Sequence, residues 1–297
     1  MRRSLRLAVA QSTVTEDPTD SANLRASGEQ IRDLMREASA VGARLVQFPE
    51  GAITYPSKHV MSSGPQGTLA AADWNRVDWD VVRTEAESVA DLAGRLGLWV
   101  AFGSPHPLTP PHRPHNSLYV VSDEGRLVSR YDKRYLSHTE ASYMYTPGTA
   151  PLVFEIDGIR LGVALCIEVN FPELFHEYEQ LGVDCLLISV MVDDAARAVV
   201  AQAYATLYNC WVGYSVPAQF GATAPATITA PGGRQLASCP CDSRPGLAIA
   251  DIDLDTQDPD IVTALRLARP WRQLAREGMY DSYVVLGDQR SENRAEF

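Results

Sequence analysis

The chain has 297 residues, of which 45% are hydrophobic and 21% are charged. These proportions are typical of a globular protein with a sizeable core, and they exclude disorder as its main state. Asp and Glu (37) outnumber Lys and Arg (26), which gives a net charge of −11. Because an acidic chain repels phosphate groups, we do not expect it to bind nucleic acid or an anionic membrane.

The apolar stretches are too short for a membrane-spanning or export segment. No run reaches the roughly 18 apolar residues that a membrane helix needs. Near the start, only residues 7–10 form an apolar run before the polar Gln11, which is too short for an export signal. The five cysteines are odd in number and indicate free thiols in a reducing compartment. We therefore expect a cytoplasmic protein.

Helix and strand signals alternate through the first hundred residues. Alternation of Leu5, Leu7 and Val9 predicts a strand, and apolar residues at helical spacing predict a helix over 21–41, capped by Asp20 or Ser21. A short buried strand at 44–48, a helix at 81–96 and a strand at 98–102 are expected next.

The rest of the chain mixes hairpins with further helices. Strands are predicted at 117–121, 126–131, 152–156, 159–165, 185–190, 211–216 and 247–252, and helices at 172–180 and 195–208. The segment 104–116 is rich in Pro and His and is predicted to be an exposed loop. This order favours an α/β fold with two helix-covered sheets, formed by a single domain over 1–261 and followed by a tail over 262–297.

Three reactive side chains follow predicted strands. Glu50 comes after the strand 44–48, Lys133 after the strand 126–131, and Cys166 after the strand 159–165. Strand ends are positions where a rigid scaffold presents catalytic groups. A thiol, an acid and an ammonium together suit covalent catalysis at a carbonyl or nitrile carbon.

The segments around these residues resemble the nitrilase superfamily of carbon–nitrogen hydrolases, whose triad is Glu, Lys and Cys in that order. The matching segments are Phe48-Pro49-Glu50, Asp132-Lys133-Arg134-Tyr135-Leu136 and Cys166-Ile167-Glu168-Val169-Asn170-Phe171-Pro172-Glu173. Glu140, ahead of Pro147-Gly148, matches a second glutamate of the family. The resemblance runs from about residue 5 to residue 252. Ile167 stands where an aromatic residue is commoner, and this departure leaves the subfamily open.

The resemblance implies an αββα sandwich of two mixed sheets flanked by helices, whose subunits pair into a homodimer or a larger homo-oligomer. It also implies hydrolysis of a linear amide or carbamoyl compound through a thioester on Cys166, without cofactor or metal. In this scheme Glu50 moves the protons, while Lys133 and the backbone N–H of Ile167 stabilise the oxyanion. Glu140 positions Lys133 or the substrate nitrogen.

Other interpretations remain open at this point. The protein could be a nitrilase that converts a nitrile to a carboxylic acid, or a catalytically silent binding protein on the same fold. His138 is a rival base for Cys166, which would give a Cys–His enzyme. A metal site at His106, His112 and His115 is disfavoured, since no acidic residue accompanies them.

The substrate pocket is predicted from the residues near the strand ends. Tyr55, Tyr143 and Met191 could supply an apolar wall, and Asp193 could bind substrate. With Glu50, Glu140 and Glu168 nearby, such a pocket would be acidic and would favour a neutral or cationic substrate.

The tail over 262–297 is too apolar to remain free in solution. Its large side chains are Leu265, Leu267, Trp271, Leu274, Met279, Tyr280 and Tyr283. Because exposed apolar patches usually mark contacts, we expect the tail to lie across a neighbouring subunit or to fold back on its own domain.

Overall fold

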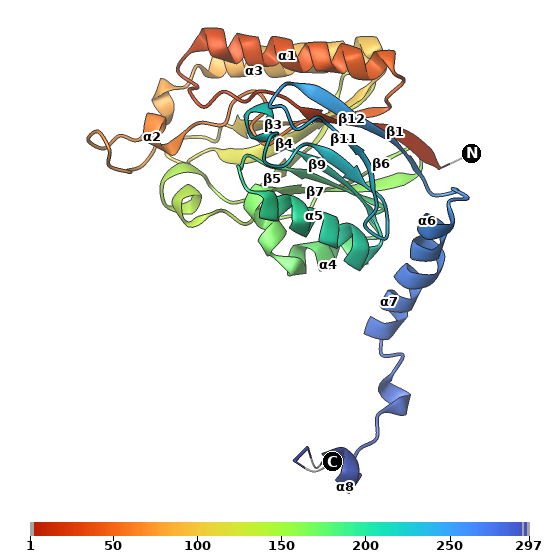
Figure 1. Ribbon diagram of the computed structural model, residues 1–297. Helices are drawn as coiled ribbons and strands as arrows, with labels where there is room; N and C mark the ends of the chain where they lie inside the picture. Colours follow the sequence, from red (N-terminus) through yellow and green to blue (C-terminus); the bar gives the residue numbers. More distant parts are fainter. Residues whose placement is uncertain (1–2, 293, 296–297) are drawn as a thin grey trace.

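A computed structural model describes residues 3–292 and 294–295. Two six-stranded mixed sheets face each other within these residues, and helices cover their outer faces (Figure 1). This arrangement confirms the predicted αββα sandwich. No helix in the described part of the chain is both long and apolar enough to cross a membrane.

The first sheet has its parallel strands in the middle. Its order is β12 (Gly246–Asp253), β1 (Ser4–Gln11), β2 (Leu45–Gln47), β3 (Trp99–His106), β4 (His115–Val121) and β5 (Leu127–Asp132). β1, β2 and β3 run parallel, whereas β12, β4 and β5 pair antiparallel with their neighbours.

The second sheet repeats this plan. Its order is β11 (Gln235–Ser238), β10 (Thr227–Thr229), β9 (Trp211–Ser215), β8 (Cys185–Ser189), β7 (Ile159–Leu165) and β6 (Val153–Ile156). β7, β8 and β9 are parallel to one another. The carboxyl ends of β7, β8 and β9 therefore lie at one edge of the sheet.

Two long helices cover the first sheet. α1 (Ser21–Ala40) begins after Asp20, whose carboxylate accepts the N–H of Ala22 at 2.9 Å, as the sequence predicts. α3 (Trp79–Leu96) is capped by Asp78 and ends at Gly97 in the left-handed conformation, which glycine adopts without steric cost. The apolar faces of both helices bury against the sheet.

The second sheet is covered by α4 (Pro172–Gln180) and α5 (Ala195–Tyr208), both at their predicted positions. The remaining elements are α2 (Lys58–Met61), η1 (Trp74–Arg76), η2 (Glu140–Met144), η3 (Cys166–Asn170), η4 (Ala218–Phe220), α6 (Pro259–Thr263), η5 (Ala264–Ala268), α7 (Arg269–Arg276), η6 (Asp281–Tyr283) and α8 (Gln289–Glu292).

Polar contacts tie the two sheets together where β2 and β8 end. The buried amide of Gln47 donates to the carbonyl oxygen of Ile188 at 3.0 Å, and Ser189 Oγ donates to the carbonyl oxygen of Phe48 at 2.8 Å. A Cβ atom on Gly213 would lie only 2.4 Å from Gln47 Oε1, so the sheets approach closely here. The segment leading to Glu50 is thus fixed against the second sheet.

The prediction of an exposed loop over 104–116 is wrong at both ends. Residues 104–106 end β3 and residues 115–116 begin β4, and the loop between them is shorter than predicted. Pro105 pairs with Asn116 within the antiparallel ladder. Ser104 and Asn116 are buried. The proline and histidine content of the segment gave no indication of this burial.

The C-terminal segment leaves the sandwich and extends away from it (Figure 1). Three arginines of α7 face the protein's own domain. Arg269 pairs with Asp184 at 3.0 Å, while Arg272 and Arg276 pair with the buried Glu179 at 2.9 and 3.0 Å. The opposite face of α7 carries Trp271 and Leu274, and Leu267 lies just before it in η5; each of these side chains is more than half exposed.

Candidate active site

A buried ammonium group joins two glutamates at the centre of the site. Lys133 Nζ donates to Glu50 Oε1 and to Glu140 Oε1, both at 2.8 Å. The Lys133 side chain is 1% exposed, that of Glu50 is 0% and that of Glu140 is 8%. The structure therefore brings together three of the residues that the sequence singled out, although 90 positions separate Glu50 from Glu140.

The backbone places each of these groups at the same end of the sandwich. Glu50 lies in the turn after β2, and Lys133 directly follows β5. Glu140 opens the helical turn η2, where its Oε2 accepts the N–H of Ser137 at 2.8 Å. This local bond holds the Glu140 carboxylate toward Lys133.

Asn116 is a site residue that the sequence did not reveal. Its side-chain amide donates to Glu50 Oε1 at 2.9 Å and to Glu140 Oε1 at 3.4 Å. It belongs to β4, in the segment wrongly predicted to be an exposed loop. Its antiparallel partner Pro105 was the misleading signal, because proline usually marks a break in a strand.

The two glutamates differ in their environment. Burial raises the pKa of Glu50 above its usual value, although Lys133 opposes the rise. Burial also opposes ionisation of Glu140, but Lys133 and Ser137 stabilise its carboxylate and bring its pKa below the usual value. Glu50 Oε2 is buried and has no hydrogen-bond partner in the described part of the chain. Glu50 is thus the better proton acceptor of the two.

Cys166 occupies a strained position at the end of β7. Its φ of 47° lies in the left-handed region, which a residue with a side chain adopts at a steric cost. Its Sγ lies 4.0 Å from the carbonyl oxygen of Met191, in the segment after β8. Burial, followed by the charge of Glu50, raises the pKa of the thiol to about 12, against an opposing effect of Lys133.

The charge of Lys133 by itself favours the thiolate form of Cys166. The ammonium acts in that direction, but burial outweighs it, so the resting group is a neutral thiol. Attack by Cys166 on an electrophile consequently requires a base to take its proton. His138, the rival base, is exposed.

The sequence suggested that Glu168 would lie on the wall of an acidic pocket. In the structure it lies in the interior instead. Its Oε1 accepts the Arg134 N–H at 2.7 Å and the Tyr131 hydroxyl at 2.8 Å, and its Oε2 accepts the Leu165 N–H at 2.7 Å. These bonds join the backbone before Cys166 to the backbone after Lys133. Glu168 thus fixes the two reactive residues relative to each other.

The predicted substrate-binding residues divide into two groups. Tyr55 borders the cluster, since its hydroxyl lies 3.4 Å from Glu140 Oε1, and Met191 borders Cys166. Tyr143 packs against the core beneath the first sheet, and Asp193 is exposed. Asp194 caps α5 by accepting the Ala196 N–H at 2.9 Å.

Ile167, the predicted oxyanion donor, is the second residue of η3, where amide groups lack partners inside the helix.

We expect Glu168→Gln to lower the free energy of unfolding by about 2 kcal/mol or more, because a charged acceptor of several buried hydrogen bonds is lost. The amide nitrogen would also face the N–H of Leu165 or Arg134, donor against donor. Urea denaturation measures the effect. Glu173→Gln, at an exposed position of α4, is the matched control, and equal stability of both variants would contradict this role.

Known proteins are similar to this chain in sequence. The family model described as carbon-nitrogen hydrolase matches residues 6–259. A deaminated glutathione amidase of Rattus norvegicus is 25% identical over 94% of this chain and 85% of its own length. An omega-amidase of Xenopus tropicalis is 24% identical over 93% of this chain and 96% of its own length.

Solved structures share the fold at low sequence identity. One is a variant amidase of Nesterenkonia sp. AN1 with acrylamide added to its active-site cysteine. It has a TM-score of 0.70 and 18% identity, and the match covers 94% of this chain and all of that one. A likeness at this identity bears on the fold alone. The match of the family model to most of the chain shows that the protein belongs to the carbon–nitrogen hydrolase family.

Proposed function

We propose that the protein is a cysteine amidase that hydrolyses a linear amide or carbamoyl compound and releases ammonia. The observation that carries this proposal is the buried Glu50–Lys133–Glu140 cluster at the end of the sandwich where Cys166 directly follows β7. The amidase names of the relatives support the same reaction class.

The first half of the reaction forms a thioester. Cys166 Sγ attacks the amide carbon while its proton passes to Glu50, whose raised pKa makes it an effective acceptor. The oxyanion that develops is stabilised by the Lys133 ammonium and the Ile167 N–H, and one such donor contributes about 3 kcal/mol. Glu50 then gives the proton to the leaving nitrogen, and ammonia departs.

The second half hydrolyses the thioester. Glu50 takes a proton from a water molecule as its oxygen attacks the thioester carbon. The tetrahedral intermediate collapses, the C–S bond breaks, and Cys166 recovers its proton from Glu50. A carboxylic acid is released, and the three side chains return to their initial states.

Glu140 serves as a positioning residue for Lys133. Its low pKa keeps it ionised throughout, so it holds the ammonium in place while the protonation state of Glu50 alternates. Its Oε1 also accepts from Asn116 and Tyr55 at 3.4 Å, which fixes the carboxylate from two further directions.

An ammonia-release screen over amides, carbamoyl compounds and nitriles tests the reaction class. Turnover of amides supports the proposal, whereas turnover of nitriles alone would make the protein a nitrilase. Failure of a thiol-reactive probe to label Cys166 selectively would favour a catalytically silent protein.

Cys166→Ala and Lys133→Ala should leave folded but inactive proteins, because the first lacks the nucleophile and the second lacks the oxyanion donor. For Lys133→Ala we expect a loss of at least about 100-fold in kcat. Glu140→Gln should also lose activity with near-normal folding. Circular dichroism checks the fold, Glu173→Gln is the control, and substantial turnover by folded Cys166→Ala would refute the mechanism.

The activity should fall in acid at a higher pH than an ordinary glutamate predicts. The pKa of Glu50 is raised above its usual value, and protonated Glu50 cannot accept the thiol proton. The acidic limb of kcat/KM should therefore lie above about pH 4.3, the value of an exposed glutamate.

The variant Asn116→Leu tests whether Glu50 is the group that sets the acidic limb of kcat/KM. The Asn116 amide stabilises the Glu50 carboxylate and lowers the pKa of that group, so its removal should move the acidic limb to still higher pH. A limb at the pH of an exposed glutamate, or a shift to lower pH in the variant, would assign the base role to another group.

A homodimer or larger homo-oligomer in a reducing cytoplasm also belongs to this proposal. The cysteines Cys166, Cys185, Cys210, Cys239 and Cys241 are all free thiols, as a thiol nucleophile requires. Domain 1–261 carries the catalytic cluster, and the tail 262–297 supplies a contact between subunits. α7 supports this contact because it turns arginines to its own domain and Trp271 and Leu274 to the outside.

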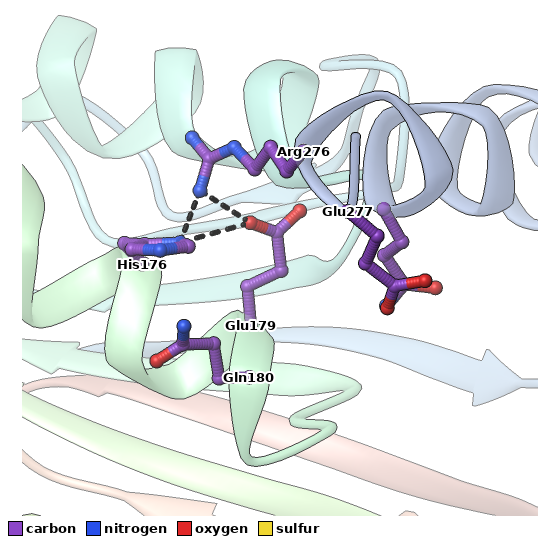
Figure 2. A pocket seen from close by; sticks show the side chains of 6 residues that line it. His176, Glu179, Gln180, Arg276 and Glu277 are labelled. Atoms are coloured by element: carbon purple, nitrogen blue, oxygen red, sulfur yellow. Dashed lines mark hydrogen bonds and ion pairs between the residues drawn. The ribbon is translucent and has the colours of Figure 1, made fainter. Parts of the chain in front are cut away.

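The attachment of α7 is polar and specific (Figure 2). Arg276 reaches both His176 and Glu179 of α4, at the wall of a cavity of about 310 Å³ between the two helices. Since this side is occupied by the protein's own domain, the outer side is the one available to a second copy.

We expect the double substitution Trp271→Ser and Leu274→Ser to weaken the oligomer, because it removes apolar surface from the proposed contact. Light scattering at micromolar concentration gives the mass. Val41→Ser removes an exposed apolar side chain at the end of α1 and is the control. A strictly monomeric wild type would end this part of the proposal.

A further inference from the structure

A second polar cluster lies on the opposite face of β4 and β5 from the catalytic cluster. Successive side chains of a strand alternate between its two faces. The Asn116 side chain points to the two glutamates, so that of the next residue, Ser117, points away from them. Ser117 pairs with Asp132 in the antiparallel ladder, and Asp132 directly precedes Lys133. The second cluster therefore lies behind the strand end that carries the catalytic ammonium.

The carboxylate of Asp132 is the centre of this second cluster. Its Oδ1 accepts the Ser117 hydroxyl and the Nε–H of Arg130, both at 2.6 Å, and its Oδ2 accepts from Arg130 Nη2 at 2.9 Å. The Asp132 side chain is only 19% exposed. Burial opposes its ionisation, but the hydrogen bonds from Arg130 and Ser117 bring the pKa of Asp132 below its usual value. The carboxylate is thus a permanent charge that holds β5 to β4.

His115 connects Asp132 to the segment that follows Glu140. Its Nε2 lies 3.9 Å from Asp132 Oδ2. Its Nδ1 lies 2.8 Å from the carbonyl oxygen of Thr146, and because a carbonyl oxygen can only accept, Nδ1 carries the proton and donates. Thr146 closely follows η2, the helical turn that Glu140 opens. The second cluster therefore contacts both of the chain segments that supply the Lys133–Glu140 ion pair.

Backbone contacts fix Lys133 between these two segments. Its N–H donates to the carbonyl oxygen of Asn116 at 2.9 Å, and its own carbonyl oxygen accepts the Gly148 N–H at 2.9 Å. A Cβ atom on Gly148 would lie 2.1 Å from the carbonyl oxygen of Asp132, an approach that only glycine allows. The segment after η2 thus packs directly on the peptide between Asp132 and Lys133, and the Lys133 ammonium extends from a backbone that is held on both sides.

We propose that Asp132 is a positioning residue for Lys133. From the outer face of the sheet it joins β5 to β4 and, through His115, to the segment after Glu140, and so holds the Lys133 ammonium at 2.8 Å from both carboxylates. It acts through the position of Lys133 and not on the substrate. The effect of this role on the reaction rate rests on the proposed amidase function, whereas its effect on the ionisation of Cys166 does not.

Asp132→Asn tests this role with little change in shape, because it removes the charge that binds Arg130. Displacement of a catalytic group by about 1 Å can cost on the order of 100-fold in rate. We therefore expect kcat per folded molecule to fall by about 10- to 100-fold and KM to change by less than about threefold. Circular dichroism gives the folded fraction.

The acidic limb of kcat/KM separates positioning from a loss of stability. Lys133 lowers the pKa of Glu50, so a displaced ammonium raises that pKa and moves the limb to higher pH. Loss of the negative charge of Asp132 alone would act in the opposite direction, because a nearby anion raises the pKa of a carboxyl group. A variant that is merely less stable has fewer folded molecules but the same limb.

Two further variants serve as comparison and control. Ser117→Ala removes one hydrogen bond to Asp132 without a change of charge and should give a smaller shift of the limb in the same direction. Glu85→Gln removes the charge from another partly buried ion pair, Arg32–Glu85 at 2.6 Å between α1 and α3, and should leave the limb at its wild-type pH. An unchanged or lower limb in Asp132→Asn, or a shift of equal size in Glu85→Gln, would make the proposal wrong.

Alkylation of Cys166 by iodoacetamide tests the same role without amide turnover. Lys133 favours the thiolate of Cys166, and the thiolate is the form that reacts. In Asp132→Asn, mass spectrometry should therefore show slower labelling of Cys166 relative to the exposed Cys241. Slower labelling in a folded variant, with no amide hydrolysed by the wild type, would support the positioning role and reject only the proposed reaction. The same ratio of labelling rates in variant and wild type would overturn the role of Asp132.

Discussion

The site depends on one ammonium group shared by two carboxylates in the interior of the protein. Lys133 can neutralise only one negative charge, so Glu50 and Glu140 compete for it at equal distances of 2.8 Å. Buried charges are costly unless they are paired. The competition is resolved by the surroundings, because Glu140 also accepts the N–H of Ser137 while one oxygen of Glu50 has no partner in the described residues.

This asymmetry divides the chemical roles. The pKa of Glu140 falls and that of Glu50 rises, and such a separation distinguishes a permanent charge from a proton carrier. The neutral Cys166 thiol complements it, because a thiol with a pKa of about 12 needs a nearby base at the moment of attack. In the proposed mechanism, the thiol therefore keeps its proton at rest and passes it to Glu50 only when an electrophile is present.

The sequence predicted the parts of this arrangement that lie at strand ends. Glu50, Lys133 and Cys166 each follow a segment with a clear strand pattern, and the helices at 172–180 and 195–208 were located to the residue. It could not reveal Asn116, whose strand pairs with Pro105, because proline content masked the strand. It also misassigned Glu168, since sequence shows that an acid is near a strand end but not that backbone N–H groups surround it.

The contacts of the C-terminal helix α7 could not be predicted from amino-acid composition alone. Counting its apolar residues suggested contact with a neighbour or with its own domain, as if these were exclusive. The structure shows contact with the domain on one face alone: the arginine side binds Glu179 and Asp184, while Trp271 and Leu274 remain exposed. Because α4 begins six residues after Cys166 and carries Glu179 near its end, the arginines brace the helix that follows the nucleophile. A partner that covers the outer face of α7 would hold α7 against the domain and so stabilise its ion pairs with α4. The same helix would then contribute both to assembly and to the rigidity of the site.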